Sequence, residues 1–424
     1  MDNKKIIPCL YLKDGMLYED FTDEKIISED PVGYAVKCCN SGADMLIIFD
    51  QSYDDASHEE ALHIMRSINR EIDIPVIGAG NIDRSEDVKK ILYASCSAAA
   101  LNLAKQGNIE LIEEVSKRFS KDKIMVCADA EEQVLESVDR IREYTSGVLL
   151  LDDKIVDSYR GLHMIPVTEE TGTESAKKIL AKECVTGISG RFANENIGSL
   201  MKTKRELKES GIETCIFSSP YTFGDFKKNT DGHVTVVVQD YKTDEVLMVA
   251  YMNEEAYNKT IETGIMTYYS RSRDELWVKG ETSGHYQYVK SLTADCDMDT
   301  ILAKVAQIGN ACHTGSYSCF FNEIVKTDAV AANPLKVFEK VYDVITDRRN
   351  NPKEGSYTNY LFDKGIDKIL KKVGEEATEI VIAAKNPDKE EVKYEIADFL
   401  YHVMVLMVEC GLDWNDIVKE LADR

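Results

Sequence analysis

The feature that most constrains the fold is the alternation of short apolar runs with helix-period stretches through residues 1–218. Strands that alternate with helices form parallel βαβ units. Eight such units in a segment of this length predict a (β/α)8 barrel. The expected strands are residues 6–10, 45–49, 75–77, 98–101, 124–127, 148–151, 163–167 and 185–188, with helices such as 58–70, 85–93 and 109–119 between them.

An internal repeat supports this barrel. Residues 41–50 are similar to residues 145–153, and residues 7–11 are similar to residues 125–129. A barrel built from two similar halves explains a repeat over this distance. Chance similarity among strand-rich segments is the alternative explanation.

Composition limits the classes of partner. The 424 residues include 51 Lys and Arg but 75 Asp and Glu, which gives a net charge of −24. Such a charge argues against a broad nucleic-acid or anionic-membrane surface. No apolar run approaches the length of a membrane span, and the apolar run at the N-terminus is too short for a signal peptide. We therefore expect a cytoplasmic protein whose 11 cysteines are free thiols or metal ligands rather than disulfides.

Two further segments predict a multidomain chain. Residues 225–326 begin with the alternation typical of strands, at 234–239 and 246–251, and predict a mainly-β α+β domain. Small residues that end in Asn-Pro predict a linker at 326–334. Residues 335–424 predict an all-α domain with helices at 336–349, 365–385, 390–410 and 414–421. Residues 386–388 interrupt the two longest helices, which should pack as an antiparallel hairpin.

Three cysteines in the middle segment have the chemistry of a zinc site. Cys296, Cys312 and Cys319 offer three thiolates, which would leave a fourth position open for water, as in catalytic zinc sites. His313 is a poor fourth ligand because it directly follows Cys312. In an extended strand, the three aspartates around Cys296 would face one side, as oxygen ligands for Mg²⁺, and Cys296 would face the other. The aspartates are Asp295, Asp297 and Asp299. The alternative is a solvated acidic turn beside buried free cysteines.

The surrounding sequence resembles the phosphoribosyl-AMP cyclohydrolase family over about 100 residues. Four stretches carry this resemblance together with Cys319, namely residues 268–273, 276–284, 295–299 and 311–315. It implies that the three cysteines bind a zinc ion shared across a dimer interface and that the three aspartates bind magnesium. It also implies hydrolytic opening of the adenine ring of phosphoribosyl-AMP between N1 and C6.

Other residues of this segment have the chemistry that such a reaction needs. His313 suits proton transfer, because the pKa of an unperturbed histidine lies near neutrality, or it forms a hydrogen bond near the metal. Arg271, Arg273 and Lys279 can neutralise phosphates. Trp277 can stack on a purine or can be an ordinary core residue.

The third segment carries a carboxylate pattern. Glu376 and Glu379 share one helix face, and Glu395 and Asp398 share a face of the next helix. If the two faces meet, four carboxylates would repel one another unless a cation lies between them, and Mg²⁺ is the natural partner of an all-oxygen site. The alternative is an exposed acidic helix face.

Residues 335–424 resemble the phosphoribosyl-ATP pyrophosphohydrolase family, chiefly through residues 371–379 and 395–402. The resemblance implies that Glu376, Glu379, Glu395 and Asp398 hold Mg²⁺ and that Glu375 is a possible general base. Lys371 and Lys372 would contact phosphates. A cyclohydrolase segment followed by a pyrophosphohydrolase segment is the arrangement of the bifunctional enzymes of histidine biosynthesis.

The first segment resembles the histidine-biosynthesis barrel family at residues 6–10, 13–15 and 74–82 and in the strand that ends at Asp129. Members of that family carry catalytic acids at the ends of strands 1 and 5. This chain keeps Asp129, but Tyr11 occupies the strand 1 position, and a tyrosine cannot act as a carboxylate base at neutral pH. We therefore interpret the barrel as inactive.

These observations predict a homodimeric bifunctional hydrolase that uses Zn²⁺ and Mg²⁺. It would remove pyrophosphate from phosphoribosyl-ATP and then open the ring of phosphoribosyl-AMP. Two alternatives remain at this stage. One is a general nucleoside triphosphate pyrophosphohydrolase with a structural zinc module and a barrel that acts as an assembly domain, and the other is a catalytic barrel.

Overall fold

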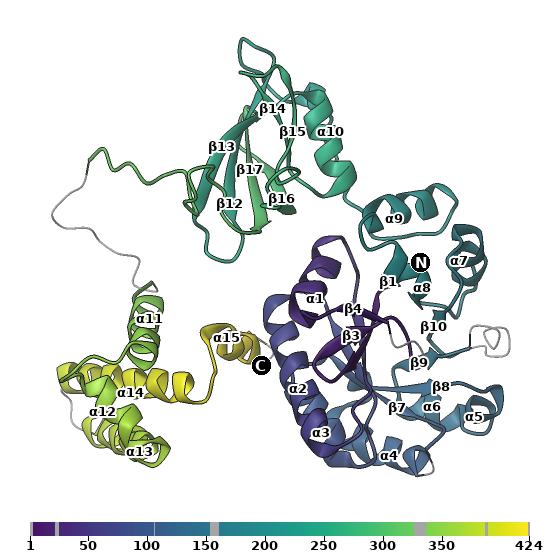
Figure 1. The fold of residues 1–424 in the computed structure, drawn as a ribbon, viewed down its shortest axis with the longest axis horizontal. Helices are drawn as coiled ribbons and strands as arrows, with labels where there is room; N and C mark the ends of the chain where they lie inside the picture. Colours follow the sequence, from purple (N-terminus) through teal and green to yellow (C-terminus); the bar gives the residue numbers. More distant parts are fainter. Residues whose placement is uncertain are drawn as a thin grey trace. The chain divides into compact units, whose positions relative to one another are not determined.

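The computed structural model describes residues 3–21, 25–105, 107–152, 161–325, 336–385 and 389–422. The chain divides into two compact units, residues 1–322 and 323–424 (Figure 1). The predicted linker at 326–334 and the predicted break at 386–388 lie outside the described residues. Within the described ranges, no helix combines the length and apolar character that crossing a membrane requires.

The N-terminal domain is a curled, mostly parallel sheet with helices packed on its outer side (Figure 1). In spatial order its strands are β1 (Lys5–Ile7), β11 (Gly187–Gly190), β10 (Met164–Thr168), β9 (Gly147–Leu150), β8 (Ile124–Ala128), β7 (Ala98–Asn102), β6 (Val76–Ala79), β5 (Leu46–Asp50), β2 (Cys9–Lys13), β3 (Met16–Tyr18) and β4 (Ile26–Ser28). β1 pairs with β11 and β2 pairs with β5, and only Pro8 separates β1 from β2. The sheet therefore curls round until strands from its two ends both pair with residues 5–13.

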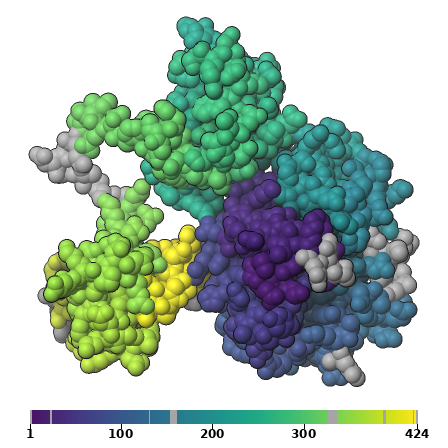
Figure 2. All heavy atoms as spheres, viewed as in Figure 1, coloured from purple at the N-terminus to yellow at the C-terminus, as the bar shows by residue number. Residues whose placement is uncertain are grey.

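Helices follow most of these strands. They are α1 (Pro31–Asn40), α2 (Asp55–Glu71), α3 (Ser85–Tyr93), α4 (Asn108–Phe119), α5 (Glu131–Leu135), α6 (Val138–Tyr144), α7 (Thr173–Leu180), α8 (Arg191–Glu195) and α9 (Leu200–Glu209). α2 starts where the side chain of Asp54 accepts a hydrogen bond from the backbone N–H of Ser57, which satisfies a free donor of the first turn. In the space-filling view of Figure 2, the purple and blue atoms of this domain lie closely packed against one another.

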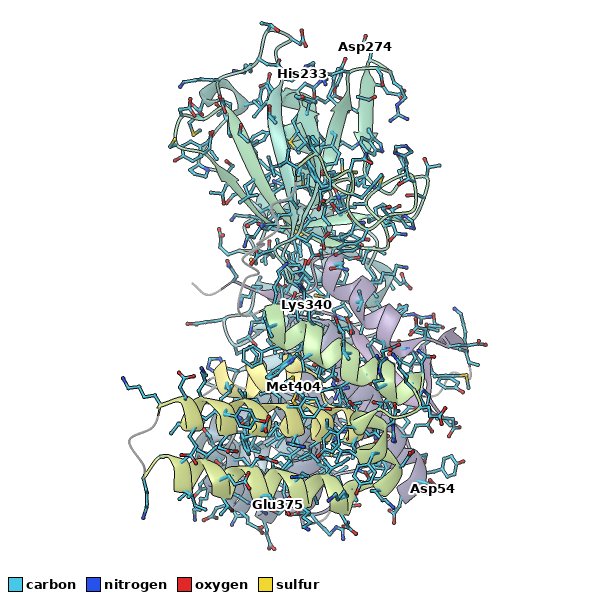
Figure 3. All side chains as sticks on the ribbon, turned by 90° about the vertical axis from the view of Figure 1, so that its left-hand side faces the viewer. Asp54, His233, Asp274, Lys340, Glu375 and Met404 are labelled. Carbon is cyan, nitrogen blue, oxygen red and sulfur yellow. The ribbon has the colours of Figure 1, made fainter. Side chains whose placement is uncertain are left out.

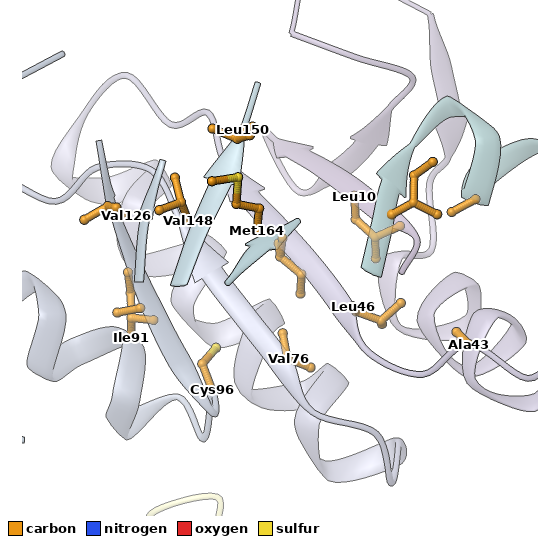
Figure 4. Packing of buried hydrophobic residues seen from close by; sticks show 14 of the residues in the cluster. Leu10, Ala43, Leu46, Val76, Ile91, Cys96, Val126, Val148, Leu150 and Met164 are labelled. Carbon is orange, nitrogen blue, oxygen red and sulfur yellow. The ribbon is translucent and has the colours of Figure 1, made fainter. Parts of the chain in front are cut away.

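Successive side chains of each strand point to opposite faces of the sheet, so the domain has two hydrophobic cores. In β5, Leu46 and Ile48 face the layer between sheet and helices, whereas Ile47 and Phe49 face the interior of the curled sheet. Figure 4 shows the outer layer, where Leu46, Val76 and Val148 lie among the side chains of the surrounding helices and strands. All eight predicted strands coincide with observed strands, to within a few residues. The antiparallel extension formed by β3 and β4 was not predicted.

The second domain of this unit contains a four-stranded sheet in the order β13, β12, β17, β16. Its elements are β12 (Val234–Asp240), β13 (Val246–Met252), α10 (Glu254–Thr263), β14 (Thr267–Ser270), β15 (Glu275–Val278), β16 (Gln287–Ala294) and β17 (Thr300–Gln307). β14 and β15 form a separate two-stranded sheet. Every second residue of β12 is buried, as expected for a strand with one face on a core. The predicted mixture of strands with few helices is observed.

The second unit is helical, as predicted. It consists of α11 (Lys336–Asn350), α12 (Tyr357–Lys364), α13 (Ile366–Ala383), α14 (Lys389–Glu409) and α15 (Trp414–Ala422). α13 and α14 are the two long helices, and Figure 3 shows them side by side, with Glu375 on α13 and Met404 on α14. The predicted multidomain organisation, with a parallel-rich N-terminal sheet and a C-terminal helical region, is therefore confirmed. α12 was not predicted.

Candidate metal centres

The three aspartates of the middle domain lie in the turn that joins β16 to β17. Asp295 accepts hydrogen bonds at Oδ1 from the backbone N–H groups of Asp299, at 3.0 Å, and Thr300, at 3.2 Å, which closes the turn. Met298 takes a left-handed φ of 64° within it. The expectation of an extended strand at 295–299 is therefore wrong. The side chain of Asp295 accepts backbone hydrogen bonds that an extended segment would leave unmade.

The turn nevertheless gathers the three carboxylates. Oxygen atoms of Asp295, Asp297 and Asp299 all lie within 4.8 Å of one another, and all three side chains are exposed. Although desolvation opposes ionisation, the N–H groups of Thr300 and Asp299 hold the pKa of Asp295 below its usual range. Lys227 Nζ lies 3.3 Å from Asp297. The cluster offers hard oxygen ligands of the kind that Mg²⁺ prefers.

Cys312 and Cys319 form a pair after β17. The Thr314 hydroxyl lies 3.0 Å from the sulfur of Cys312 and, with its own backbone N–H, lowers the pKa of that thiol. Desolvation and the neighbouring Cys312 raise the pKa of Cys319. The pair therefore favours a thiolate on Cys312, and the thiolate is the form of sulfur that binds metals.

Lys279 lies beside this pair and is almost completely buried. Its Nζ donates to the backbone carbonyl of Ala311 at 2.9 Å, and burial lowers its pKa while the thiols of Cys319 and Cys312 oppose that shift. Lys279 also lies 5.7 Å from the ring of Trp277, which packs against Tyr268. The structure thus places Lys279 against the backbone and the cysteine pair.

The remaining candidates of this domain are on its surface. Arg271 lies over the ring of Tyr251 at 3.8 Å, and Arg273 pairs with Glu275 at 3.2 Å. His313, next to Cys312, is exposed. Their predicted roles in phosphate binding and proton transfer stay predictions.

Cys296 does not join the other two cysteines within one chain. It lies in the β16–β17 turn, whereas the backbone N–H of Cys319 donates to the carbonyl of Leu247 in β13, at the opposite edge of the four-stranded sheet from β16. Neighbouring strands are about 4.8 Å apart, so the separation across the sheet is on the order of 10 Å. Zn–S bonds are about 2.3 Å long. Among the described residues, neither group close enough to hold a metal includes a cysteine.

A cavity of about 570 Å³ adjoins the aspartate turn. Its walls combine aromatic and aliphatic side chains such as Phe226, Tyr257 and Leu292, and Asp295 and Cys296 lie at its edge. Mainly apolar walls with a few polar groups are typical of ligand pockets. The sequence patterns gave no indication of this cavity.

In the helical unit, α13 and α14 bring predicted metal ligands together. Oxygen atoms of Glu376, Glu395 and Asp398 lie within 4.8 Å of one another, and Glu376 is only 4% exposed. Glu379 lies at the edge of this cluster, where hydrogen bonding and repulsion from Glu376, and then from Glu395, raise its pKa. A buried carboxylate among like charges is costly unless a cation neutralises it, so the side chains present fit Mg²⁺.

Two lysines of α13 contact its carboxylates. Lys372 Nζ lies 3.1 Å from Glu375 and 3.2 Å from Glu376, and Lys371 Nζ lies 3.3 Å from Glu375. The two lysines hold the pKa of Glu375 below its usual range, and Lys372 contributes most. A low pKa weakens a general base, so Glu375 can act as one only when it is released from these lysines.

His402 is a residue of this site to which the sequence analysis gave no role. It is 5% exposed, and its Nδ1 lies 3.6 Å from Glu376. Its position one helical turn after Asp398 was the available signal, because residues four apart share a helix face.

Comparison with known families gives three matches. Residues 248–321 match the phosphoribosyl-AMP cyclohydrolase family, residues 338–424 match the phosphoribosyl-ATP pyrophosphohydrolase family, and residues 5–154 match the histidine biosynthesis protein family. The first two matches cover both metal-ligand patterns.

Curated relatives match the chain along most of their own length. The histidine biosynthesis bifunctional protein HisIE of Thermoanaerobacter pseudethanolicus is 53% identical over 209 residues, which cover 46% of this chain and 97% of the relative. The protein of the same name in Bacillus subtilis is 52% identical over 196 residues, which cover 46% of this chain and 93% of the relative.

Proposed function

The chain belongs to the family of bifunctional histidine-biosynthesis enzymes that join phosphoribosyl-AMP cyclohydrolase and phosphoribosyl-ATP pyrophosphohydrolase domains, and on this basis we propose that it catalyses both reactions in sequence. Water cleaves the triphosphate of phosphoribosyl-ATP and releases pyrophosphate. A second water then adds to C6 of the adenine ring, and the N1–C6 bond breaks. The observation that carries this proposal is that two separate ligand sets of different chemistry lie in the two matched regions.

The helical unit performs the first reaction. Glu376, Glu379, Glu395 and Asp398 would hold Mg²⁺ at the interface of α13 and α14, where the charge of the cation relieves their mutual repulsion. Lys371 and Lys372 lie on α13 close enough to bind a triphosphate that displaces Glu375 from them. Glu375, once released, would accept the proton of the attacking water.

The middle domain performs the second reaction. Cys312 and Cys319 would supply two zinc ligands, and Cys296 would supply the third from a second chain, because the turn that contains it lies too far from the pair in its own chain. The aspartate cluster would hold Mg²⁺. Bound zinc lowers the pKa of water toward about 7, which makes hydroxide available near neutral pH. His313 is exposed next to Cys312 and is our candidate for proton transfer.

The experiment that tests the proposal is incubation of the full chain with phosphoribosyl-ATP, Mg²⁺ and Zn²⁺. We expect pyrophosphate, a transient pool of phosphoribosyl-AMP and then the ring-opened product, each followed by chromatography. Hydrolysis of ordinary nucleoside triphosphates without turnover of phosphoribosyl-ATP would contradict the proposal and favour a general pyrophosphohydrolase.

Shared zinc ligands predict complementation between chains. Cys296→Ser and Cys312→Ser should each abolish ring opening, but a mixed dimer of the two variants contains one intact ligand set. Random pairing of equal amounts should restore about a quarter of wild-type ring opening, because half of the dimers are mixed and each has one working site of two. The rate is measured after co-expression and compared with each variant alone. No recovery in folded mixed dimers would show that the three cysteines act within one chain.

We propose that the N-terminal domain is a (β/α)8 barrel without catalytic activity. Pairing of β1 with β11 and of β2 with β5 supports closure. Tyr11 is 3% exposed and its ring centroid lies 4.7 Å from that of Phe21 and 5.6 Å from that of Phe49. Burial raises the pKa of Tyr11. An aromatic cluster thus occupies the position at which the resemblance to the histidine-biosynthesis barrel family implies an acid.

Asp129→Asn tests this assignment. Asp129 is exposed and accepts a hydrogen bond from Gln133 at 2.6 Å, and no carboxylate is available from Tyr11 to act with it. We expect both steady-state rates to stay within about twofold of wild type, as for an ordinary surface substitution. A large loss of either activity in a folded variant would overturn the inactive assignment.

A further inference from the structure

A line of polar contacts crosses the helical unit and ends at its most buried carboxylate. Tyr357 of α12 has its hydroxyl 3.1 Å from Nε2 of His402 on α14. On the other side of the ring, Nδ1 lies 2.9 Å from the backbone carbonyl of Asp398 and 3.6 Å from Oε1 of Glu376 on α13. Three helices therefore meet at one buried imidazole.

The partners of His402 fix its tautomer. A carbonyl oxygen only accepts hydrogen bonds, so Nδ1 carries a proton and donates it to Asp398. In the neutral ring Nε2 is then an acceptor, and the Tyr357 hydroxyl donates to it. The ring is held at both nitrogens, which leaves one orientation in which the Nδ1–H edge faces Glu376.

One oxygen of the Glu376 carboxylate lies close to both the ammonium group of Lys372 and the imidazole ring of His402. Oε1 of Glu376 lies 3.2 Å from Nζ of Lys372 as well as 3.6 Å from His402. Lys372 donates a hydrogen bond to Oε1, and the ring of His402, whose Nδ1–H is given to the Asp398 carbonyl, lies against the same oxygen and limits where it can move. Glu379 also shares a hydrogen bond with Glu376 on the side of the cluster.

We propose that Tyr357 and His402 are positioning residues for the cation site, which orient Glu376 so that it meets a divalent ion together with Glu395 and Asp398. This inference rests on the proposed pyrophosphohydrolase site and adds to it two residues outside the carboxylate set. Removing a partner that orients a metal ligand typically lowers metal affinity 10- to 100-fold. The effect of these residues should therefore appear in the affinity for the ion more than in the rate at saturation.

Tyr357→Phe is the sharpest test, because it removes one oxygen atom and keeps the ring. The matched control is Tyr360→Phe on the same helix. Its ring stacks on Tyr357 with centroids 6.1 Å apart, and Tyr360 has no described hydrogen bond to His402. Mn²⁺ alone is the probe, and its binding to the full chain is measured by electron paramagnetic resonance. The Mn²⁺ ions that wild type binds and Glu376→Gln does not bind are counted as the ions at this site.

We expect Tyr357→Phe to weaken Mn²⁺ binding at this site about tenfold and to raise the Mg²⁺ concentration for half-maximal pyrophosphate release by a similar factor. The rate at saturating Mg²⁺ should stay within about twofold, and Tyr360→Phe should match wild type. His402→Asn should weaken binding at least as much as Tyr357→Phe. Equal affinities in Tyr357→Phe, Tyr360→Phe and wild type would overturn the proposal.

Two measurements separate this outcome from failure of the proposed function. If wild type itself binds no ion that Glu376→Gln loses, the magnesium site is wrong and not only its positioning. Thermal unfolding of every variant is recorded, because His402 is buried and His402→Asn can destabilise the unit. Tyr357→Phe still decides the question if His402→Asn does not fold.

Discussion

Cys312→Ser should abolish ring opening and leave pyrophosphate release intact. Serine keeps the size of the side chain but replaces a thiolate, whose pKa the Thr314 hydroxyl lowers, with a poor zinc ligand. We expect ring opening to fall at least about 100-fold, because losing a ligand should exceed the effect of losing a residue that only orients one. Phosphoribosyl-AMP should then accumulate from phosphoribosyl-ATP at the wild-type rate, which chromatography measures directly.

A matched cysteine separates zinc loss from general damage. Cys215 is an exposed free cysteine of the same unit outside both proposed ligand sets, so Cys215→Ser should keep both rates and the zinc content. Cys312→Ser should instead lose zinc by elemental analysis. If Cys312→Ser abolished both activities while remaining folded, the assignment of the two reactions to two separate sites would be wrong.

The elements that set the fold could be predicted because local patterns specify them. Leu46 to Phe49 alternate between two cores, and this pattern of neighbouring residues specifies the strand. Ser57 completes a capping box with Asp54, which specifies the start of α2 in the same local way. α12 was missed because its eight residues include Tyr, Thr and Asn, which are weak helix formers. Its main local signal is Ser356, whose side chain caps Asn359.

The candidate sites show where sequence patterns stop being sufficient. The carboxylates of α13 and α14 could be predicted to meet, because spacing on a helix fixes a face and a short connection makes neighbours antiparallel. Spacing alone could not show how Cys296 lies relative to Cys312 and Cys319, since this depends on the order of strands in a sheet, and only the family resemblance implied a zinc ion shared between chains. His402 was missed for a similar reason, because its contact with Tyr357 joins helices whose packing no local pattern determines.

Glu376→Gln should abolish pyrophosphate release and leave ring opening intact, which is the reverse of the result expected for Cys312→Ser. The amide keeps the shape of a nearly buried side chain but removes a charge from the proposed ion site. We expect pyrophosphate release to fall at least about 100-fold, since a ligand is lost rather than only its orientation. Ring opening of added phosphoribosyl-AMP should stay within about twofold of wild type.

The control is Glu391→Gln, which neutralises an exposed carboxylate of the neighbouring helix α14 outside the cluster and should leave both rates unchanged. A Glu376→Gln protein that kept pyrophosphate release would show that the ion binds elsewhere. Loss of both activities in a folded protein would show instead that the two units do not work independently.

The metal-free stability of Glu376→Gln distinguishes a functional carboxylate from a structural one. Hydrogen bonding and repulsion from Glu376 raise the pKa of Glu379 above its ordinary value of 4.5. The folded state therefore favours protonated Glu379, and this contribution to stability is present below pH 4.5 and is lost as the pH rises through the raised pKa. At pH 7 without metal, the wild-type cluster is thus destabilised by its own charges.

Removing one charge should relieve this repulsion, so at pH 7 without metal Glu376→Gln should unfold at the same or a higher temperature than wild type, although its pyrophosphate release is lost. Added Mg²⁺ should raise the melting temperature of the helical unit in wild type and not in Glu376→Gln, because only wild type binds the ion at the cluster of α13 and α14 in its folded state. Calorimetry with and without Mg²⁺ measures both effects. A lower melting temperature of metal-free Glu376→Gln would mean that the carboxylate stabilises the helices directly, through Lys372 and His402, and that ion binding is not the reason it is buried.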